Sequence, residues 1–486
     1  MKTLDELFLT HQYRQLPTHF YQSLVPTPLR GSSALVAVSA DAAQLLDLDL
    51  CRQDQQQLKA LLTGHWLPAD AKPLAMKYAG HQFGFYNPAL GDGRGLLLGE
   101  INNSQGEHWE LHLKGAGRTA FSRSGDGRAV LRSSIREFLG SEALFHLGIP
   151  TTRALAVAVS TEPVRREGIE SAATLLRLSR SHIRFGHFEH CYYTGDHKGL
   201  QQLLDQVIRL HYPELCDHDD PAVAFLAAVQ QRSAKMVAAW QAYGFCHGVL
   251  NTDNLSILGE TFDFGPFAFL DHYHPSFVCN HTDEQGRYAF NRQPSIVHWN
   301  LACLGQALTP LASEAAIRRV LDDFGNSFTQ EYRQLMATRL GVDAKQDWAL
   351  IEQFLALCEA SRADWTQLLR LLAEGHHSDF ITQLQAGFKQ PISAATRWLN
   401  DWQQAIEQSL PDAAARKERL CAVNPCVLPR SFLLQQAIEQ AEAGDFSEVN
   451  RLLSVFRQPF NSAGKTPGDL QSPPDWAAGL VLSCSS

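Results

Sequence analysis

The stretch from His247 to Gly265, HGVLNTDNLSILGETFDFG, contains the residues that best indicate the fold. Asn254 and Asp263 offer an amide oxygen and a carboxylate, and hard oxygen ligands of this kind suit Mg²⁺ that also contacts phosphates. The segment between them predicts a short pair of strands joined by a tight turn, which would bring both side chains to one face. The alternative is an ordinary polar turn between two strands. We interpret the pair as a candidate metal site.

A lysine and a glutamate upstream extend this pattern. The apolar runs between Leu96 and Gly115, with turn residues between them, predict two strands joined as a hairpin. Lys114 ends the second strand, from which an ammonium group can reach phosphate oxygens. Glu137 lies on the following amphipathic helix, where it can pair with the lysine and orient it. The alternatives are a solvated lysine at a strand end and, for Glu137, a capping box with Ser134.

Lysine, glutamate, asparagine and aspartate occur in this order in protein kinases, which position a nucleotide and neutralise its charge. The sequence therefore predicts an α+β, protein-kinase-like fold of two lobes, with a small mixed α/β N-lobe and a large, mainly helical C-lobe that carries a C-terminal extension. Counting from His247, the usual catalytic aspartate would be residue 249, which is Val249 and cannot accept a proton. Asp253, next to Asn254, is the replacement candidate for the general base.

Two further segments can hold phosphates. The GDGRG run, Gly91–Gly95, precedes the first strand, and its backbone amides and Arg94 could surround an anion. The segment LLRLSRSHIRFG supplies Arg177, Arg180 and Arg184, whose forked donors suit a triphosphate. The alternative is a solvated face of a strand. If these arginines bind the terminal phosphate, the α-phosphate is exposed to attack, so that AMP rather than phosphate is transferred.

Hydrophobic pattern and composition divide the chain of 486 residues into four parts. We expect an N-terminal extension (1–75), a kinase-like N-lobe (76–197), a helical C-lobe (198–456) with a catalytic loop at 247–265, and a C-terminal tail (457–486). The extension is predicted to mix short helical and irregular pieces. The tail is rich in Pro, Gly and Ser and is predicted to form an extended strap.

Composition narrows the classes of function. Hydrophobic residues make up 45% of the chain and charged residues 19%, which allows a sizeable core. The formal net charge of −9 argues against a nucleic-acid partner bound by bulk electrostatics. The N-terminus lacks the apolar core of a signal peptide, and no run approaches the ~18 apolar residues that span a bilayer. We therefore expect a cytoplasmic protein with no nucleic-acid or membrane partner.

Several long strings of the sequence are specific enough to indicate a family. They are YAGHQFG (78–84), NPALGDGRGLLLGE (87–100), ELHLKGAGRTAFSRSGDGRAVLRSSIREFLGSEAL (110–144), GIPTTRAL (148–155), SRSHIRFGHFE (179–189), HGVLNTDNLSILGETFDFGPFAFLD (247–271) and CNHTDEQGRYAFNRQPSIVHWNL (279–301). Together with the terminal Cys484-Ser485-Ser486, they resemble the selenoprotein O (SelO/YdiU) family of pseudokinases.

The resemblance implies an activity and a set of site residues. Members of this family are protein adenylyltransferases that bind ATP inverted relative to ordinary kinases and transfer AMP to Ser, Thr or Tyr hydroxyls of target proteins, with redox proteins as an expected class of target. Some members also use UTP, which adds UMP transfer to the expected activities. The implied roles are a proton acceptor (Asp253), Mg²⁺ or Mn²⁺ ligands (Asn254 and Asp263), an ion-pair partner of the lysine (Glu137), and nucleotide contacts from Gly91, Gly93, Arg94, Lys114, Asp126, Gly127, Arg177, Arg184 and Asp263.

The resemblance also suggests redox regulation through two cysteines. Animal members carry selenocysteine near the C-terminus, at a position that corresponds to Cys484. Cys279 follows the Asp-Phe-Gly segment, where an activation segment would run. A bridge between Cys279 and Cys484 would hold the tail over the active site. The alternative is two unpaired thiols, as expected in a reducing cytosol.

Two other functions are compatible with the motifs. A small-molecule phosphotransferase of kinase-like fold shares the His-Gly opening and the Asn…Asp pair, but such enzymes normally keep the aspartate that Val249 replaces. A non-catalytic, ATP-binding pseudokinase scaffold is the other alternative. Labelling with ATP that carries the label on the α- or the γ-phosphate separates all three functions.

Overall fold

The computed structural model describes residues 2–387 and 393–483 of the chain. Its main β-sheet is eight-stranded and antiparallel, in the order β1-β3-β6-β7-β10-β9-β2, with β8 paired to β10. The hairpin predicted between Leu96 and Gly115 is confirmed as β6 and β7, which pair from Gly95↔Lys114 to Asn102↔His108. The chain thus combines an antiparallel sheet with many helices.

The strands of the main sheet differ in length, and β9 and β10 are the longest. The sheet comprises β1 (Tyr21–Ser23), β2 (Ser33–Val38), β3 (Leu74–Met76), β6 (Gly95–Asn102), β7 (His108–Lys114), β8 (Ala129–Val130), β9 (Arg153–Arg165) and β10 (Ile169–Ser179). Two small antiparallel pairs lie outside it: β4 (Gly80–Gln82) with β5 (Phe85–Asn87), and β11 (Phe245–Cys246) with β12 (Ala268–Phe269).

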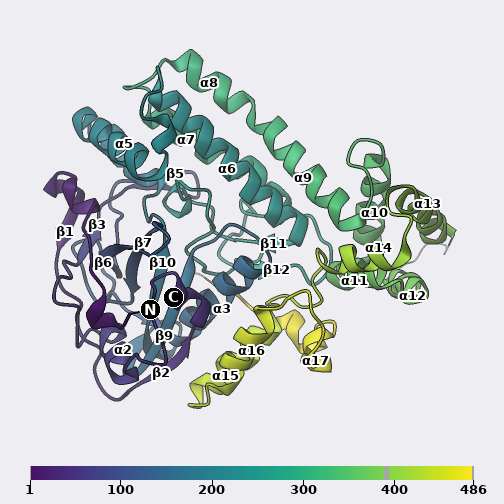
Figure 1. Ribbon diagram of the computed structural model, residues 1–486, viewed down its shortest axis with the longest axis horizontal. Coiled ribbons are helices and arrows are strands. Elements are labelled where there is room, and N and C mark those ends of the chain that lie inside the picture. Colours follow the sequence, from purple (N-terminus) through teal and green to yellow (C-terminus); the bar gives the residue numbers. More distant parts are fainter. Residues whose placement is uncertain (1, 388–392, 484–486) are drawn as a thin grey trace.

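Helices cover the sheet and form a helical region beside it (Figure 1). In the view of Figure 1, α6 to α9 lie above the sheet and α10 to α14 form the right-hand end, whereas α15 and α16 return to pack against α3. In chain order the helices are α1 (Ala40–Gln44), α2 (Gln55–Leu62), α3 (Leu131–His146), α4 (Phe185–Tyr193), α5 (His197–His211), α6 (Pro221–Tyr243), α7 (Gln293–Ala307), α8 (Glu314–Asp322), α9 (Phe324–Leu340), α10 (Trp348–Ser361), α11 (Trp365–Glu374), α12 (His377–Gly387), α13 (Ser393–Ser409), α14 (Ala413–Cys421), α15 (Ser431–Glu442), α16 (Ser447–Phe456) and α17 (Pro467–Leu470).

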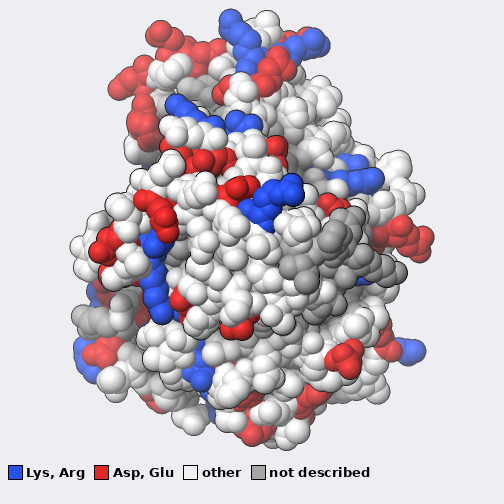
Figure 2. Space-filling view, turned by 90° about the vertical axis from the view of Figure 1, so that its right-hand side faces the viewer, with Lys and Arg blue, Asp and Glu red and all other residues white. Residues whose placement is uncertain are grey.

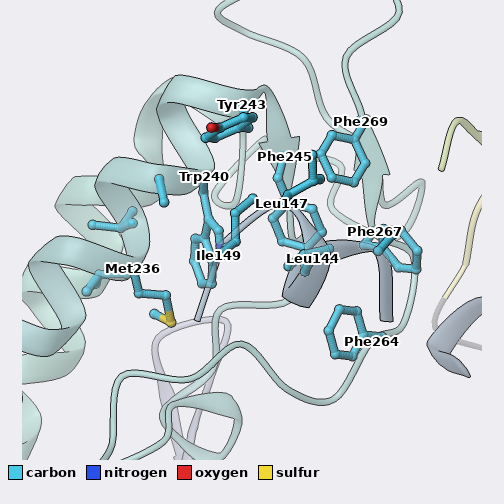
Figure 3. Packing of buried hydrophobic residues seen from close by; sticks show 14 of the residues in the cluster. Leu144, Leu147, Ile149, Met236, Trp240, Tyr243, Phe245, Phe264, Phe267 and Phe269 are labelled. Atoms are coloured by element: carbon cyan, nitrogen blue, oxygen red, sulfur yellow. The ribbon is translucent and has the colours of Figure 1, made fainter. Parts of the chain in front are cut away.

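Aromatic residues join the end of α3 and the end of α6 to the segment that follows Asp263 (Figure 3). Phe264 packs edge-on against Phe267 with 5.6 Å between ring centroids, and Phe267 stacks on Phe245 at 5.7 Å. Aromatic pairs of this geometry contribute about 0.5–1.5 kcal/mol beyond the burial of their area. The cluster therefore anchors the backbone next to Asp263.

The segment between Asn254 and Asp263 does not form the expected pair of strands. Its backbone pairs with other parts of the chain instead: Ser256 forms a bridge with Arg184, and Thr261 forms one with Thr151. Because these partners use the hydrogen-bonding groups of the segment, it does not fold back on itself. The two ends of the segment are brought together by packing rather than by a hairpin.

Residues 1–75 and the tail contain more regular structure than expected. β1 and β2 come from residues 1–75 and belong to the main sheet, and the tail includes α17 and a short 3₁₀ helix, Asp475–Gly479. In β2, Val36 and Val38 are of a residue type that favours strands, whereas Ala34 and Ala37 are not. In α17, Pro467 occupies the first turn, where its missing N–H would have no partner within the helix.

On the face shown in Figure 2, charged residues of both signs are interspersed, and uncharged residues cover most of the area. Interspersed charges keep a surface hydrated without creating a large field of one sign. Across residues 2–387 and 393–483, no helix is both long and apolar enough to cross a membrane.

A buried ion pair between α3 and β9 leads to a prediction about stability. The carboxylate of Glu142 accepts hydrogen bonds from Nε and Nη2 of Arg153 at 2.7 and 2.8 Å, and from Ser39 Oγ at 2.6 Å. We expect Glu142→Ala to lower the free energy of unfolding by about 3–5 kcal/mol, because the charge of Arg153 then stays buried without its partner. The control is Glu314→Ala, which breaks an exposed pair with Arg318 and should cost less than about 1 kcal/mol. Denaturant titration measures both, and equal losses would contradict the prediction.

Candidate active site

Strands β7 and β10 direct basic side chains to one face of the sheet. Leu113 and Leu176 lie opposite each other and pack on the face that α1 and α2 cover. Because successive side chains of a strand point to opposite sides, His112, Lys114 and Arg177 point to the other face. The register places Arg177 directly opposite His112. All three side chains are buried, and Lys114 and Arg177 give this face its positive charge.

Glu137 on α3 binds two of these residues. Its carboxylate pairs with Lys114 Nζ, and its Oε1 accepts a hydrogen bond of 2.7 Å from Arg177 Nε. Burial by itself would raise the pKa of Glu137, but the charges of Arg177 and Lys114 outweigh burial, so its pKa lies below the usual value. Burial lowers the pKa of Lys114, although the charge of Glu137 opposes this shift. The ion pair expected from the order of the motifs is therefore present.

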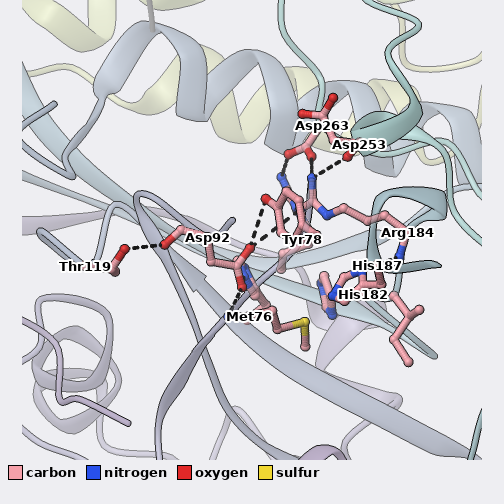
Figure 4. Close-up of polar contacts among 12 residues, drawn as sticks. Met76, Tyr78, Asp92, Thr119, His182, Arg184, His187, Asp253 and Asp263 are labelled. Carbon is pink, nitrogen blue, oxygen red and sulfur yellow. Dashed lines mark hydrogen bonds and ion pairs between the residues drawn. The ribbon is translucent and has the colours of Figure 1, made fainter. Parts of the chain in front are cut away.

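Asp263 lies between two arginines. Its Oδ1 is 2.8 Å from Arg177 Nη2, and its Oδ2 pairs with Arg184 Nη1 (Figure 4). Burial would raise the pKa of Asp263, but the charges of Arg184 and Arg177 hold its pKa well below the usual range. Each carboxylate oxygen has a second lone pair. Asp263 can therefore bind a metal ion while it keeps both arginines.

Arg184 is held in position from several sides. Its guanidinium group lies over the rings of Tyr78 and Phe262, at 4.6 and 4.7 Å from the ring centroids. Its Nη1 donates to the backbone oxygen of Asp253 at 2.7 Å, and its Nη2 lies 3.8 Å from Asp92 Oδ1. Figure 4 shows Arg184, which precedes the first residue of α4, extending toward Asp263. These contacts fix the side chain before any ligand binds, which favours precise recognition of an anion.

Asp253 and Asn254 belong to a short 3₁₀ helix that begins at Thr252. Asn254 Nδ2 donates to the backbone oxygen of Val249 at 3.1 Å, so Asn254 Oδ1 is the atom of this side chain that can bind a cation. Asp253 Oδ2 accepts a hydrogen bond of 3.2 Å from Gln82 Nε2. Its Oδ1 is buried and has no hydrogen-bond partner among the residues that the structure describes. Burial raises the pKa of Asp253 to about 7.

These side chains line one pocket of about 570 Å³, a size typical of small-molecule sites. Val249 is part of its wall, where a kinase would carry its catalytic aspartate. Glu137 lies behind the wall and contacts it through Lys114. The lining includes the residues to which the family resemblance assigns a nucleotide, metal or base role: Gly91, Gly93, Arg94, Lys114, Asp126, Gly127, Arg177, Arg184, Asp253, Asn254 and Asp263.

Two residues are placed differently from what the motifs suggested. Arg180 is exposed and does not belong to the pocket lining, because β10 ends at Ser179 and the chain turns away. Asp126 lies at the rim, where its carboxylate binds Arg166 at 2.8 Å and accepts a hydrogen bond of 2.8 Å from the N–H of Arg128. In this structure Asp126 therefore stabilises its own loop.

Sequence reasoning did not single out three residues of the site. Asp92 accepts a hydrogen bond of 3.1 Å from the N–H of Met76 and pairs with His112, and Gln82 contacts Asp253. Asp92 lies within the GDGRG run and Gln82 within YAGHQFG, so a polar residue among glycines was the signal that could have identified both. His112 had no signal beyond its alternation with leucines along β7.

The pocket combines cationic side chains with a pair of hard oxygen donors. The cations for which we expected a phosphate role are Lys114, Arg177 and Arg184, which are buried, and Arg94, which is half-buried. The amide oxygen of Asn254 and the carboxylate of Asp263 are donors that fit Mg²⁺ or Mn²⁺. These two properties suit a site that binds a nucleotide and transfers one of its phosphorus-containing groups.

Comparison with known proteins identifies the family. Residues 3–457 match the family described as protein adenylyltransferase SelO. The chain is 48% identical to the protein nucleotidyltransferase YdiU of Pseudomonas aeruginosa strain LESB58, with 100% of both chains covered. It is 47% identical, again with 100% of both chains covered, to the proteins of the same name from Pseudomonas putida GB-1 and Stutzerimonas stutzeri A1501. The chain therefore belongs to the SelO family, as its motifs suggested, and it is a nucleotidyltransferase.

The loop at Gly127 leads to a prediction about nucleotide binding. Gly127 has a φ of +74°, and a Cβ there would lie 2.2 Å from the carbonyl group of Gly117. We expect Gly127→Ala to weaken binding of an ATP analogue that resists cleavage by about tenfold or more, because the loop that lines the pocket must shift to accommodate the added Cβ. Gly148→Ala is the matched control: Gly148 has a φ of +78° but no atom within 4 Å of the added Cβ. Isothermal titration calorimetry measures both affinities, and equal values would refute the steric explanation.

Proposed function

We propose that this chain transfers AMP from ATP to Ser, Thr or Tyr hydroxyls of other proteins, on a two-lobed, protein-kinase-like fold. The observation that carries the proposal is the pair of buried arginines, Arg177 and Arg184, on either side of Asp263. Val249 adds support, because an ordinary kinase needs an aspartate at this position. Membership of a family described as protein adenylyltransferases supports the same reaction.

The two arginines favour ATP in an inverted orientation. Both guanidinium groups are buried, and Glu137 and Asp263 fix their directions. Forked donors bind phosphate oxygens at two points, so we assign them to the terminal phosphate. The γ-phosphate is then innermost, and the α-phosphorus remains accessible to the acceptor. The group transferred from such a nucleotide is AMP.

The transfer needs a base, for which Asp253 is the candidate. The acceptor hydroxyl gives its proton to Asp253 Oδ1, and its oxygen forms a bond to the α-phosphorus. The bond from that phosphorus to the oxygen bridging to the β-phosphate breaks, and pyrophosphate leaves. Gln82 orients Asp253 through Oδ2 and does not occupy Oδ1. A divalent cation, Mg²⁺ or Mn²⁺, held by Asn254 and Asp263 supplies positive charge to the phosphates.

The residues assigned above do not specify which nucleobase or which acceptor protein is used. These residues are assigned to the phosphates, and none is assigned to the nucleobase, so we include UMP transfer from UTP in the proposal. Redox proteins are the acceptors that the family resemblance suggests. UMP transfer and transfer to redox proteins would both use the same pocket and need no further catalytic group.

Labelled nucleotides test the proposal directly. The protein is incubated with Mg²⁺ or Mn²⁺ and ATP labelled on either the α- or the γ-phosphate, together with a bacterial protein extract. Protein labelled by the α-phosphate alone supports AMP transfer. Label from the γ-phosphate on a protein or a small molecule supports a phosphotransferase, and no transfer of either label supports a scaffold.

Substitutions of the two aspartates separate the base from the metal ligand. We expect Asp253→Ala to slow AMP transfer by about 10²–10⁴-fold while ATP still binds, because only the proton acceptor is lost. Asp263→Ala should abolish transfer, because the metal ligand is lost and the charges of Arg177 and Arg184 lose their partner. Asp401→Ala, on an exposed position of α13, is the control. Wild-type turnover in Asp253→Ala would refute the assignment of the base.

We also propose that Cys279 and Cys484 form a redox-sensitive bridge that holds the tail over the site. Cys484 lies outside the described residues. Cys279 is buried in a small apolar cluster against which Leu482 packs, and the N–H of His281 donates to the backbone oxygen of Leu482 at 3.0 Å. The described part of the tail therefore reaches the segment that contains Cys279.

Peptide mapping without reduction checks this bridge. After mild oxidation, we expect a cross-linked peptide that contains Cys279 and Cys484 and that disappears in the Cys279→Ser variant. Cys216→Ser changes an exposed cysteine and serves as the control. If oxidation never yields the linked pair, the bridge does not exist.

A further inference from the structure

Hydrogen bonds fix the β4–β5 hairpin to the short 3₁₀ helix that contains Thr252 and Asp253. The N–H of His81 donates to Thr252 Oγ1 at 2.7 Å, and the buried carboxylate of Glu189 binds both Thr252 Oγ1 and His81 Nδ1. The next residue, Gln82, donates to Asp253 Oδ2 at 3.2 Å. These contacts join Thr252 and Asp253 to the hairpin, so the hairpin and the candidate base form one unit.

The turn of the hairpin presents an aromatic ring at an unfavourable backbone position. Phe83 has a φ of +52° and is followed by Gly84 at +89°. Turns with two positive φ values favour Asn and Gly, and a bulky residue rarely adopts such a φ. The N–H of Phe83 donates to Tyr288 Oη at 2.9 Å, and its ring packs on Tyr288 yet stays 40% exposed. An aromatic residue at such a position indicates a role at the surface.

The register of the hairpin decides which side chains share a face. Gln82 pairs with Phe85, and His81 pairs with Tyr86. Because paired residues of antiparallel strands point to the same side, Phe85 lies on the face from which Gln82 reaches Asp253. Phe85 is 79% exposed. The exposed ring of Phe85 thus lies on the same face of the hairpin as the Gln82 side chain that contacts Asp253.

We propose that Phe83 and Phe85 form the docking surface for the acceptor protein. The partner is an extended segment that carries an apolar side chain, such as Leu or Phe, close in sequence to the residue that receives AMP. Contact with the two rings removes apolar surface from water on both sides, which stabilises the complex. This inference rests on the proposed function and defines the acceptor side of the same site.

The position of the hairpin favours a polypeptide over the nucleotide as the occupant. Lys114, Arg177 and Arg184 supply the charges for phosphates, whereas Phe83 and Phe85 are apolar. Gln82 and Phe83 line the pocket and Phe85 lies beyond its lining, so the hairpin runs from the base to the open surface. Relatives are named protein nucleotidyltransferases, and a protein acceptor has to reach the base along such a path.

Peptide acceptors test the docking surface. Synthetic peptides carry one central Ser, Thr or Tyr and have Leu, Phe, Ala, Lys or Glu at each flanking position in turn. With ATP labelled on the α-phosphate, we expect the wild-type protein to prefer Leu or Phe at one flanking position. Phe85→Ser should abolish this preference and raise the KM for the preferred peptide about tenfold, which corresponds to about 1.4 kcal/mol, with kcat unchanged.

Two further variants sharpen the comparison. Phe83→Asn removes the second ring while it keeps a residue that tolerates positive φ, and it should raise the same KM. Phe8→Ser is the matched control, because Phe8 is also an exposed phenylalanine, at 74%, and does not belong to the pocket lining. Thermal unfolding of each variant shows whether it is folded.

Each outcome supports or overturns the inference. If Phe85→Ser has the same KM and the same peptide preference as Phe8→Ser, the proposed docking surface is refuted, whereas the proposal of AMP transfer is unaffected. A loss confined to kcat would assign the hairpin to positioning of Asp253 and would also overturn docking. If the wild-type protein transfers AMP to no acceptor, the proposed function fails and this inference fails with it.

Discussion

Buried charges of alternating sign hold the site together, and the rest of the structure is arranged around them. Lys114 binds Glu137, Glu137 binds Arg177, Arg177 binds Asp263, and Asp263 binds Arg184. A buried charge without a partner is costly, so removal of any one member leaves its neighbours with that cost. These ion pairs connect β7, α3 and β10 with Asp263 and Arg184. The ion pairs that hold these elements together therefore also form part of the pocket.

The same network links the phosphate side of the pocket to the acceptor side. Arg184 binds Asp263 and also donates to the backbone oxygen of Asp253, the candidate base. Gln82 of the β4–β5 hairpin holds the carboxylate of Asp253 from the other direction. Movement of the hairpin would therefore shift the carboxylate of Asp253. The contact with Arg184 also fixes Asp253 relative to the arginines proposed to hold the terminal phosphate. Such preorganisation lowers the cost of aligning two substrates.

Much of the fold could be predicted because it follows from local patterns. Apolar runs separated by turn residues predicted β6 and β7, and the helical spacing of Ile135, Phe138 and Leu139 predicted α3. The expected strand pair between Asn254 and Asp263 was wrong because its backbone groups bond to segments far away in the chain. β1 and β2 were missed for a related reason: short edge strands show little pattern of their own and depend on the partner strand.

The sequence by itself determined which side chains are available for the chemistry, since the types and order of Lys114, Glu137, Asn254 and Asp263 are read directly from the chain. Only the tertiary structure decided which arginines take part: Arg177 points into the pocket from within β10, whereas Arg180 lies just past the end of the strand and faces solvent. It also decided that Gln82 meets Asp253, 171 positions later in the chain. Local patterns depend on neighbours within one turn or one strand, whereas such contacts depend on how whole elements pack, which no single segment encodes.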